Sequence, residues 1–192
     1  NETIIDLCAG AGGKSLLLAD SLNNIKIIAT DINLIRLDKI KDRAKRNKVE
    51  GKINIELNYH NLNTLADRVI CDVPCSGSGA WRRRPEEKIS LTKNKFEKLI
   101  ESQRDILDYG ASLTKIRGEL VYITCSILNK ENRRQIDSFL KDNPNFEIVD
   151  LKYSWDNITN SKKWFGEEKY CQLLPNIHEC DGFFIARLTK TN

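Results

Sequence analysis

The sequence predicts an α/β fold with a doubly wound, mostly parallel β-sheet. Three observations lead to this prediction: short apolar runs alternate with segments of helical periodicity, the first run enters a glycine-rich loop, and the last two runs have no helix between them. The alternation indicates parallel strands joined by helices, and the final two runs indicate an antiparallel C-terminal edge pair. Ligands of such sheets bind at the carboxyl ends of the strands.

The first half of the chain supplies four predicted strands, at residues 3–8, 25–30, 53–57 and 67–74. A helix follows the glycine-rich loop, because KSLLLADSLNN carries apolar residues at helical spacing. An amphipathic helix follows the second strand. We expect it to bury Ile32, Ile35, Ile40 and Ala44.

The second half of the chain begins with a long helix, predicted from Phe96 to about Lys115. GELVYITC (118–125) is rich in β-branched residues and is typical of a buried strand. A further helix is predicted within residues 130–143, where it ends before a proline. The closing strands are FEIVDL and GFFIARLTK, and they form the predicted edge pair.

The length of the chain favours one domain spanning residues 1–192. Its 31 basic side chains slightly outnumber its 27 acidic side chains. None of the six cysteines lies in a CxxC pair, so we expect no metal and a reduced, cytoplasmic protein. No apolar stretch is long enough to predict a membrane span, and a monomer is expected. Because the chain has no Met and its first strand begins near residue 1, we expect it to be a fragment.

The glycine-rich loop DLCAGAGGKS departs from two known phosphate-binding patterns. A P-loop would need glycine in place of Cys8, and the dinucleotide fingerprint would need glycine in place of Ser15. Asp31, after the second strand, can accept hydrogen bonds from ribose hydroxyls. These features favour a nucleoside without a pyrophosphate, such as S-adenosylmethionine; the alternative is a turn selected for packing.

Two cysteines follow buried strands, in DVPCSGSG (72–79) and ITCS (123–126). If the two strands are neighbours, Cys75 and Cys125 can point into one crevice above the sheet. Two thiols in a cofactor cleft indicate covalent chemistry, whereas a free cysteine is more often a small buried apolar residue. We assign the second interpretation to Cys71.

Five ordered blocks carry a family resemblance: DLCAGAGGKS, ATDIN, DVPCSGSGAWRRRP, VYITCSILNKEN and QLLP with DGFF. Together they resemble the catalytic domain of the RNA 5-methylcytosine methyltransferases, the group typified by the bacterial 16S ribosomal RNA enzyme and its Sun-type relatives. The resemblance implies a class I S-adenosylmethionine fold and an RNA partner, with ribosomal RNA expected first and transfer RNA second. It also implies that an N-terminal RNA-binding region is missing here.

The resemblance implies a mechanism with two thiols. Cytosine C5 is a poor nucleophile, but addition of a thiolate to C6 makes the ring an enamine that can take a methyl group at C5. Cys125 matches the attacking residue, and Cys75 matches the residue that aids release after the C5 proton is lost. Asp72 would hold the base edge, and Lys14 would orient Asp72 or the base.

The implied cofactor-binding residues lie along the loop and at two strand ends: Cys8, Ala9, Gly10, Gly12, Gly13, Lys14, Asp31 and Asp72. Arg82 and Arg83 match paired arginines that would bind phosphate, although a solvated basic turn is the alternative. Trp81 could stack on a base or pack within the protein, and Asn132 would brace the Cys125 loop.

Two departures from the family pattern stand out. Ala11 replaces a usual proline, and NYHNLN after the third strand lacks the usual acidic residue that contacts adenine. Asn58 or Asn61 could supply an amide there.

Two rival functions remain open. A DNA cytosine-C5 methyltransferase would use Cys75 as the attacking residue. A catalytically silent RNA-binding or assembly factor would keep the fold only as a scaffold.

Overall fold

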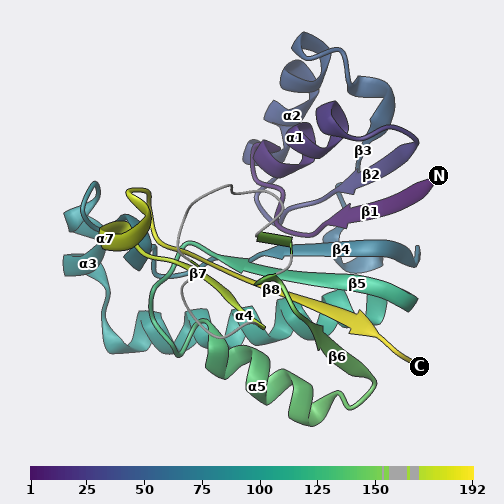
Figure 1. The fold of residues 1–192 in the computed structure, drawn as a ribbon. Helices are drawn as coiled ribbons and strands as arrows, with labels where there is room; N and C mark the ends of the chain where they lie inside the picture. The colour runs from purple at the N-terminus through teal and green to yellow at the C-terminus, as the bar shows by residue number, and fades with distance from the viewer. Residues whose placement is uncertain (153, 156–163, 165–168) are drawn as a thin grey trace.

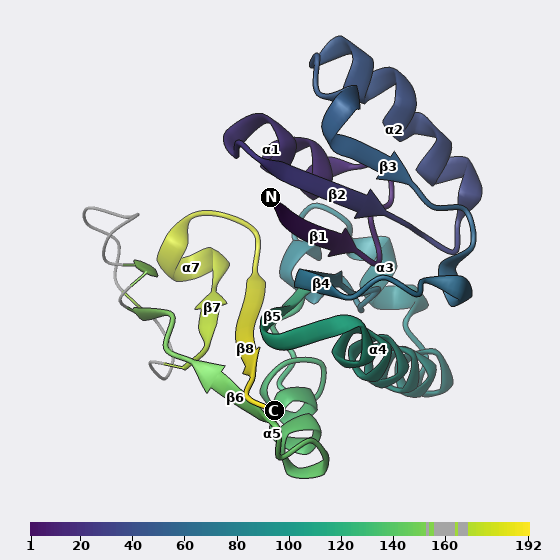
Figure 2. The ribbon, with the colours of Figure 1, turned by 90° about the vertical axis from the view of Figure 1, so that its right-hand side faces the viewer.

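The computed structural model describes residues 1–152, 154–155, 164 and 169–192, apart from the side chain of Asn61. It contains one mixed sheet with the strand order β3-β2-β1-β4-β5-β8-β6, and β7 also pairs with β8 (Figure 1). Helices cover both faces of this sheet (Figure 2). The predicted doubly wound α/β architecture is confirmed.

The strands are β1 (Glu2–Asp6), β2 (Ile25–Ala29), β3 (Ile53–Ile55), β4 (Ala66–Asp72), β5 (Thr114–Thr124), β6 (Phe146–Val149), β7 (Cys171–Leu173) and β8 (Phe183–Lys190). The α-helices are α1 (Gly13–Ser21), α2 (Leu34–Arg46), α3 (Pro85–Ser90), α4 (Lys93–Leu113), α5 (Arg133–Asp142) and α7 (Pro175–His178). Short 3₁₀ turns are η1 (Glu50–Lys52), η2 (Tyr59–Asn61) and η3 (Ser78–Ala80).

Alternation along the strands builds two cores. In β1, Ile4 packs with α1 on one face, whereas Ile5 packs with α4 and α5 on the other face. Both side chains are fully buried, as expected for a parallel strand covered on both sides. The parallel pairing of β1, β2, β3, β4 and β5 brings their carboxyl ends to one edge of the sheet.

The predicted antiparallel pair at the C-terminus is confirmed, but β8 is not at the edge. Leu188 of β8 pairs with Leu120 of β5 on one side and with Ile148 of β6 on the other. The edge is therefore occupied by β6 and by the short β7, which the sequence pattern did not predict.

The predicted buried face of α2 is partly wrong. The helix begins at Leu34, after Asn33 accepts a hydrogen bond from the backbone of Arg36, so Ile32 lies outside it. Ile32 and Ile35 are 76% and 79% exposed. The buried face consists of Leu37, Ile40 and Ala44, which recur at three- and four-residue spacing.

Two glycines join the C-terminal segment to the loops at the carboxyl edge. The backbone N–H of Gly79 donates to the carbonyl of Cys125, and the N–H of Gly182 donates to the carbonyl of Gly79. A Cβ on Gly79 would overlap the carbonyl oxygen of Gly182. Only glycine therefore allows these three chain segments to approach so closely.

We expect Gly79→Ala to lower the free energy of unfolding by about 1–3 kcal/mol, because the overlapping group is backbone and cannot move aside. Gly51→Ala is the matched control, since a Cβ there meets no atom within 4 Å, and it should change stability by less than about 0.5 kcal/mol. Urea unfolding of both variants measures the difference. Equal stabilities would contradict this account of the glycine contact.

Candidate active site

The site lies where the parallel strands end. Asp6 is the last residue of β1, and Asp72 is the last residue of β4. Asp31 lies just beyond β2, and Cys125 lies just beyond β5. The sheet thus brings together four side chains that are far apart in the sequence.

The glycine-rich loop has the backbone shape that its glycines allow. Gly10 and Gly12 have φ values of 55° and 82°, in the left-handed region that disfavours side chains. A Cβ on Gly10 would lie 2.6 Å from the guanidinium of Arg36, and one on Gly12 would lie 2.8 Å from Ile40. Ala11, the departure from the family pattern, is accommodated, and its carbonyl accepts a hydrogen bond from Arg43.

A pocket of about 240 Å³ opens beside this loop. Its lining residues are Asp6, Cys8, Ala9, Ala11, Gly13, Lys14, Arg36 and Asp72. Five of the predicted cofactor-binding residues are among them, whereas Gly10 and Gly12 shape the loop without lining the pocket. The sequence analysis missed Asp6 and Arg36, which add charge to the pocket wall.

Asp31 is placed differently from the other predicted residues. It is buried, and its two carboxylate oxygens accept hydrogen bonds from the backbone N–H groups of Gly10 (2.8 Å) and Asn33 (2.7 Å). It thereby ties the loop to the end of β2. Each oxygen keeps a further lone pair, so ribose binding by Asp31 stays a prediction.

Lys14 and Asp72 form an ion pair across the pocket. Both side chains are about one-third exposed, so they remain accessible from solvent. The predicted role of Lys14 in orienting Asp72 is consistent with this contact. Cys8, on the same wall, has its pKa raised by burial, so it stays a thiol.

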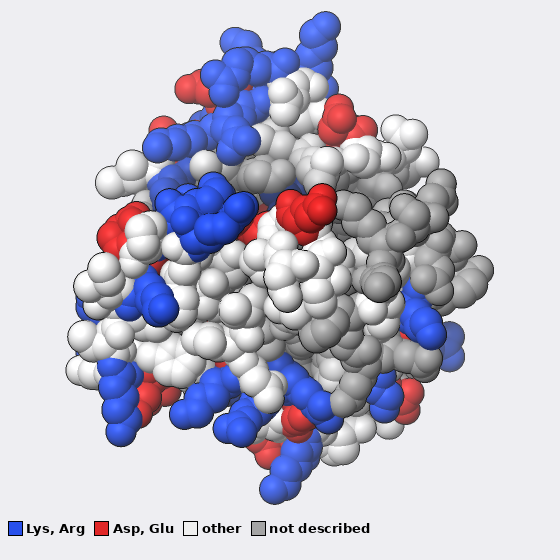
Figure 3. Space-filling model, turned by 60° about the vertical axis from the view of Figure 1, so that its left-hand side comes forward, with Lys and Arg blue, Asp and Glu red and all other residues white. Residues whose placement is uncertain are grey.

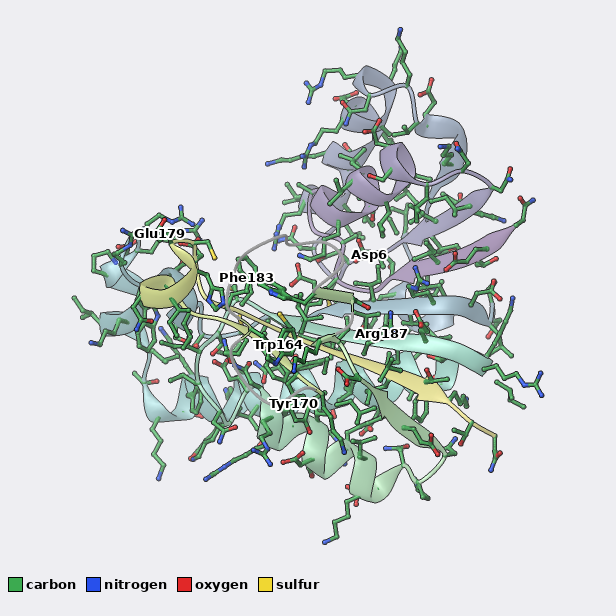
Figure 4. All side chains as sticks on the ribbon, in the orientation of Figure 1. Asp6, Trp164, Tyr170, Glu179, Phe183 and Arg187 are labelled. Carbon is green, nitrogen blue, oxygen red and sulfur yellow. The ribbon has the colours of Figure 1, made fainter. Side chains whose placement is uncertain are left out.

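Asp6 is a buried carboxylate at the carboxyl end of β1 (Figure 4). The hydroxyl of Ser15 donates to its Oδ2 at 2.6 Å, whereas its Oδ1 has no hydrogen-bond partner within the described part of the chain. Burial raises the pKa of Asp6 from 3.8 to about 6, and the Ser15 hydrogen bond opposes this rise. Oδ1 is closed off from solvent, so Asp6 acts on the pocket through its negative charge, which favours a cationic ligand.

The two predicted thiols are in contact. The Sγ atoms of Cys75 and Cys125 lie 3.2 Å apart, and both residues are half-buried. The hydrogen bond from Cys75 lowers the pKa of Cys125, and the same contact, with burial, raises the pKa of Cys75. Of the two sulfurs, the contact therefore favours negative charge on Cys125, with Cys75 as its hydrogen-bond donor. Cys71, in contrast, is fully buried within the core.

The predicted RNA-binding arginines lie in an exposed turn. Arg83 pairs with Asp181, and its Nε lies 3.0 Å from the carboxylate. Arg82 has no ion pair among the residues that the structure describes. The indole N–H of Trp81 donates to the carbonyl of Ser76 at 3.1 Å, so Trp81 packs against the Cys75 loop.

Helix α2 carries many basic side chains. Figure 3 shows Lys and Arg gathered at the top of this face, where α2 lies, with further groups below them. The basic residues of α2 are Arg36, Lys39, Lys41, Arg43, Lys45 and Arg46.

Asn132 braces the Cys125 loop as predicted. It accepts a hydrogen bond from the hydroxyl of Thr124 (2.6 Å) and donates to the carbonyl of Ser126 (2.9 Å). The residue before it, Glu131, is fully buried and was missed by the sequence analysis. The only available signal was its place in the family block VYITCSILNKEN.

The acidic residue Glu56 lies two positions before the segment NYHNLN. The carboxylate of Glu56 directly follows β3 and accepts a hydrogen bond from the backbone N–H of Asn58 at 2.9 Å. The side chain of Asn58 is exposed, and that of Asn61 lies outside the described residues. Neither Glu56 nor Asn58 is among the residues that line the pocket.

Among the residues that the structure describes, no group of three or more His, Cys, Asp or Glu side chains is arranged to hold a metal ion. None of the helices in that part of the chain is long and apolar enough to cross a membrane.

Comparison with known proteins gives matches over nearly the whole chain. The family model described as 16S rRNA methyltransferase RsmB/F matches residues 1–189. Ribosomal RNA small subunit methyltransferase B of Shewanella oneidensis is 35% identical over 195 residues, covering 99% of this chain and 43% of the relative. The Photorhabdus laumondii protein of the same name is 34% identical over 193 residues, covering 98% and 42%. The chain thus spans less than half the length of these curated relatives.

Two solved structures share the fold. NSun6 from Pyrococcus horikoshii, solved with SFG, has a TM-score of 0.82 at 26% identity, covering all of this chain and 48% of that one. A methyltransferase homolog protein from Pyrococcus horikoshii has a TM-score of 0.74 at 28% identity, covering 99% and 62%. The predicted fold class, that of the class I methyltransferases, is confirmed.

We expect Asp6→Asn to stabilise the protein at pH 8. Because the pKa of Asp6 is higher in the folded than in the unfolded chain, the folded chain binds the proton more tightly, and stability falls as pH rises from about 4 to about 6. At about 1.4 kcal/mol per pKa unit, the neutral amide should regain up to about 3 kcal/mol above pH 7 and almost nothing near pH 4.

Urea unfolding at pH 4 and pH 8 checks this expectation. Asp20→Asn serves as the control, because Asp20 is exposed on the adjacent helix α1 and its substitution should be close to neutral at both values. A loss of stability at pH 8 in Asp6→Asn would contradict the expectation.

Proposed function

The chain belongs to the RsmB/F family of 16S rRNA methyltransferases, and from this premise we propose that it is the catalytic part of an S-adenosylmethionine-dependent RNA cytosine-C5 methyltransferase. We place its activity in the cytoplasm, with ribosomal RNA as substrate. The observation that carries the proposal is the pair of thiols 3.2 Å apart, in loops beside the pocket at the carboxyl edge.

The pocket supports S-adenosylmethionine as the cofactor. Its wall carries the carboxylates of Asp6 and Asp72, of which Asp6 has an oxygen without a partner in the described chain, and these groups fit a ligand with a sulfonium and an ammonium group. SFG, the ligand of the NSun6 structure, is an analogue of this cofactor. When bound, the cofactor supplies an electrophilic methyl group.

Cys125 is the proposed nucleophile. The Cys75 hydrogen bond stabilises its thiolate, which is the reactive form of cysteine. Attack at cytosine C6 forms a carbon–sulfur bond and leaves C5 with the electron pair that takes the methyl group. Asp72, which is paired with Lys14, is the proposed acceptor of hydrogen bonds from the N4 amino group and from a protonated N3.

Cys75 is the proposed aid to release. After methylation, C5 must lose its proton before the electron pair can expel the Cys125 sulfur. Once Cys125 is bonded to C6, its sulfur no longer carries the charge that raises the pKa of Cys75, so Cys75 can lose its proton to solvent and, as a thiolate beside the adduct, take the C5 proton. This assignment differs from that of a DNA cytosine-C5 methyltransferase, in which Cys75 would be the attacking residue.

The exposed turn that follows the Cys75 loop supports the proposal that the target cytosine is extruded from its RNA helix. A cytosine inside a duplex cannot reach Cys125, so the target must be single-stranded or flipped out. Arg82 and Arg83 lie in the turn that follows the Cys75 loop and are exposed. Arg82 is the freer phosphate ligand, since Asp181 already holds Arg83.

We expect Cys125→Ala and Cys75→Ala to fail at different steps. Cys125→Ala should lower the methylation rate at least about 10³-fold and form no covalent RNA complex, because the attacking sulfur is gone. Cys75→Ala should also stop turnover but accumulate protein joined to RNA, because release fails. Denaturing gel electrophoresis with radiolabelled ribosomal RNA distinguishes the two results.

Cys71→Ala is the matched control, since this thiol is buried in the core and away from the pocket, and it should form no trapped complex. If Cys75→Ala abolished the adduct, the DNA-type assignment would replace ours. If the unmodified protein bound no S-adenosylmethionine in calorimetric titration, the catalytically silent factor would be favoured.

A further inference from the structure

Glu131 is a fully buried carboxylate in the turn before α5. It is absent from the residues that line the pocket beside the glycine-rich loop, as are Cys75 and Cys125. Burying a charged carboxylate is costly unless several donors compensate it. Its contacts therefore indicate what the charge is used for.

Four hydrogen bonds converge on this carboxylate. Oε1 accepts the backbone N–H of Ser76 (2.7 Å) and the side-chain amide of Gln103 (2.9 Å). Oε2 accepts the hydroxyls of Ser76 and Ser126, both at 2.5 Å. Ser76 directly follows Cys75 and Ser126 directly follows Cys125, so one side chain holds the residue after each of the two cysteines.

The surroundings of Glu131 are themselves fixed. Its backbone carbonyl accepts the hydroxyl of Tyr122 on β5 at 2.7 Å. Gln103 on α4 also donates to the carbonyl of Pro74, the residue before Cys75. Hydrogen bonds thus hold Glu131 to a strand and to a helix. Through Ser76 and Ser126, its carboxylate fixes both loops relative to these two elements.

We propose that Glu131 is a positioning residue that holds the Cys75 and Cys125 loops at the spacing at which one thiol can hydrogen-bond to the other. The inference deepens the proposed function and rests on it, because the spacing matters through the attacking sulfur. All four partners of the carboxylate are donors. A neutral amide could not replace it, since its NH₂ group cannot accept a hydrogen bond.

Two effects of Glu131 on Cys125 have opposite signs. The negative charge of Glu131 raises the pKa of Cys125 directly. The negative charge of Asp72, which is paired with Lys14, does the same. The Cys75 hydrogen bond lowers that pKa and is the largest influence on it, whereas the direct effect of Glu131 is the smallest. If Glu131 acts by positioning, its loss must therefore raise the pKa of Cys125.

The test measures alkylation of Cys125 by iodoacetamide as a function of pH, without RNA or cofactor, by mass spectrometry of the Cys125 peptide. We expect the midpoint to move to higher pH in both Glu131→Gln and Glu131→Asp, because neither side chain can hold both serines. A shift of one pH unit corresponds to an about tenfold slower reaction at pH 7. Glu119→Gln is the control, since it makes the same change in the middle of β5, where Glu119 pairs with Arg68, and its midpoint should match the unmodified protein.

Two results would overturn the proposal. A midpoint at lower pH in Glu131→Gln, with Glu131→Asp unchanged, would mean that Glu131 acts only through its charge. Unchanged midpoints in both variants would mean that Glu131 contributes only to folding.

Ser126→Ala provides a second route to the same answer if the Glu131 variants do not fold. It leaves Ser76 and Gln103 on the carboxylate but frees the Cys125 loop, so the midpoint should again rise; an unchanged midpoint would overturn the proposal. The readout is independent of methylation. A failure of the proposed function would appear as inactive unmodified protein, whereas a failure of this inference would appear only in the thiol reactivity.

Discussion

The contact between the sulfurs of Cys75 and Cys125 is the interaction on which the rest of this structure depends. It follows from the register of two neighbouring parallel strands, in which Asp72 pairs with Ile123. The chain continues past both residues with a hydrogen bond from the N–H of Val73 to the carbonyl of Ile123, at 3.0 Å. A cysteine three residues after Asp72 and another two residues after Ile123 then meet above the sheet.

The same edge concentrates negative charge. Asp6, Asp31 and Asp72 end three adjacent strands, and burial already raises the pKa of Asp6 to about 6. Such an arrangement destabilises the folded chain unless cations compensate it, which Lys14 does for Asp72. A cationic cofactor would compensate the remaining negative charge. An edge whose carboxylates are poorly compensated by the protein itself is therefore well suited to binding such a cofactor.

Much of the fold and of the candidate site could be predicted from the sequence. Alternating strands and helices gave the sheet, because their periodicities are local, and the family blocks gave the two thiols and the loop. The start of α2 was misjudged because the Asn33 cap, rather than the run of isoleucines, sets where that helix begins. β7 is three residues long and depends on pairing with β8, so no local pattern predicts it.

Arg36 and Glu131, two of the residues missed in the site, share a common cause. Arg36 lies beside the glycine-rich loop and Glu131 bonds to Ser76, 55 residues away, and contacts between such distant parts of the chain leave no periodic signal. A charged residue in a sequence is normally assigned to the surface. Only the three-dimensional structure shows that Glu131 is fully buried and bonded to both serines.

The most direct test of the central claim is to identify the cysteine that attacks the base. RNA containing 5-azacytosine has nitrogen at position 5 and no C5 proton to lose, so a methylated adduct cannot be released. Protease digestion and mass spectrometry then locate the attached nucleotide in the unmodified protein. Our account predicts attachment to Cys125 alone. Attachment to Cys75, or no attachment to either thiol, would contradict it.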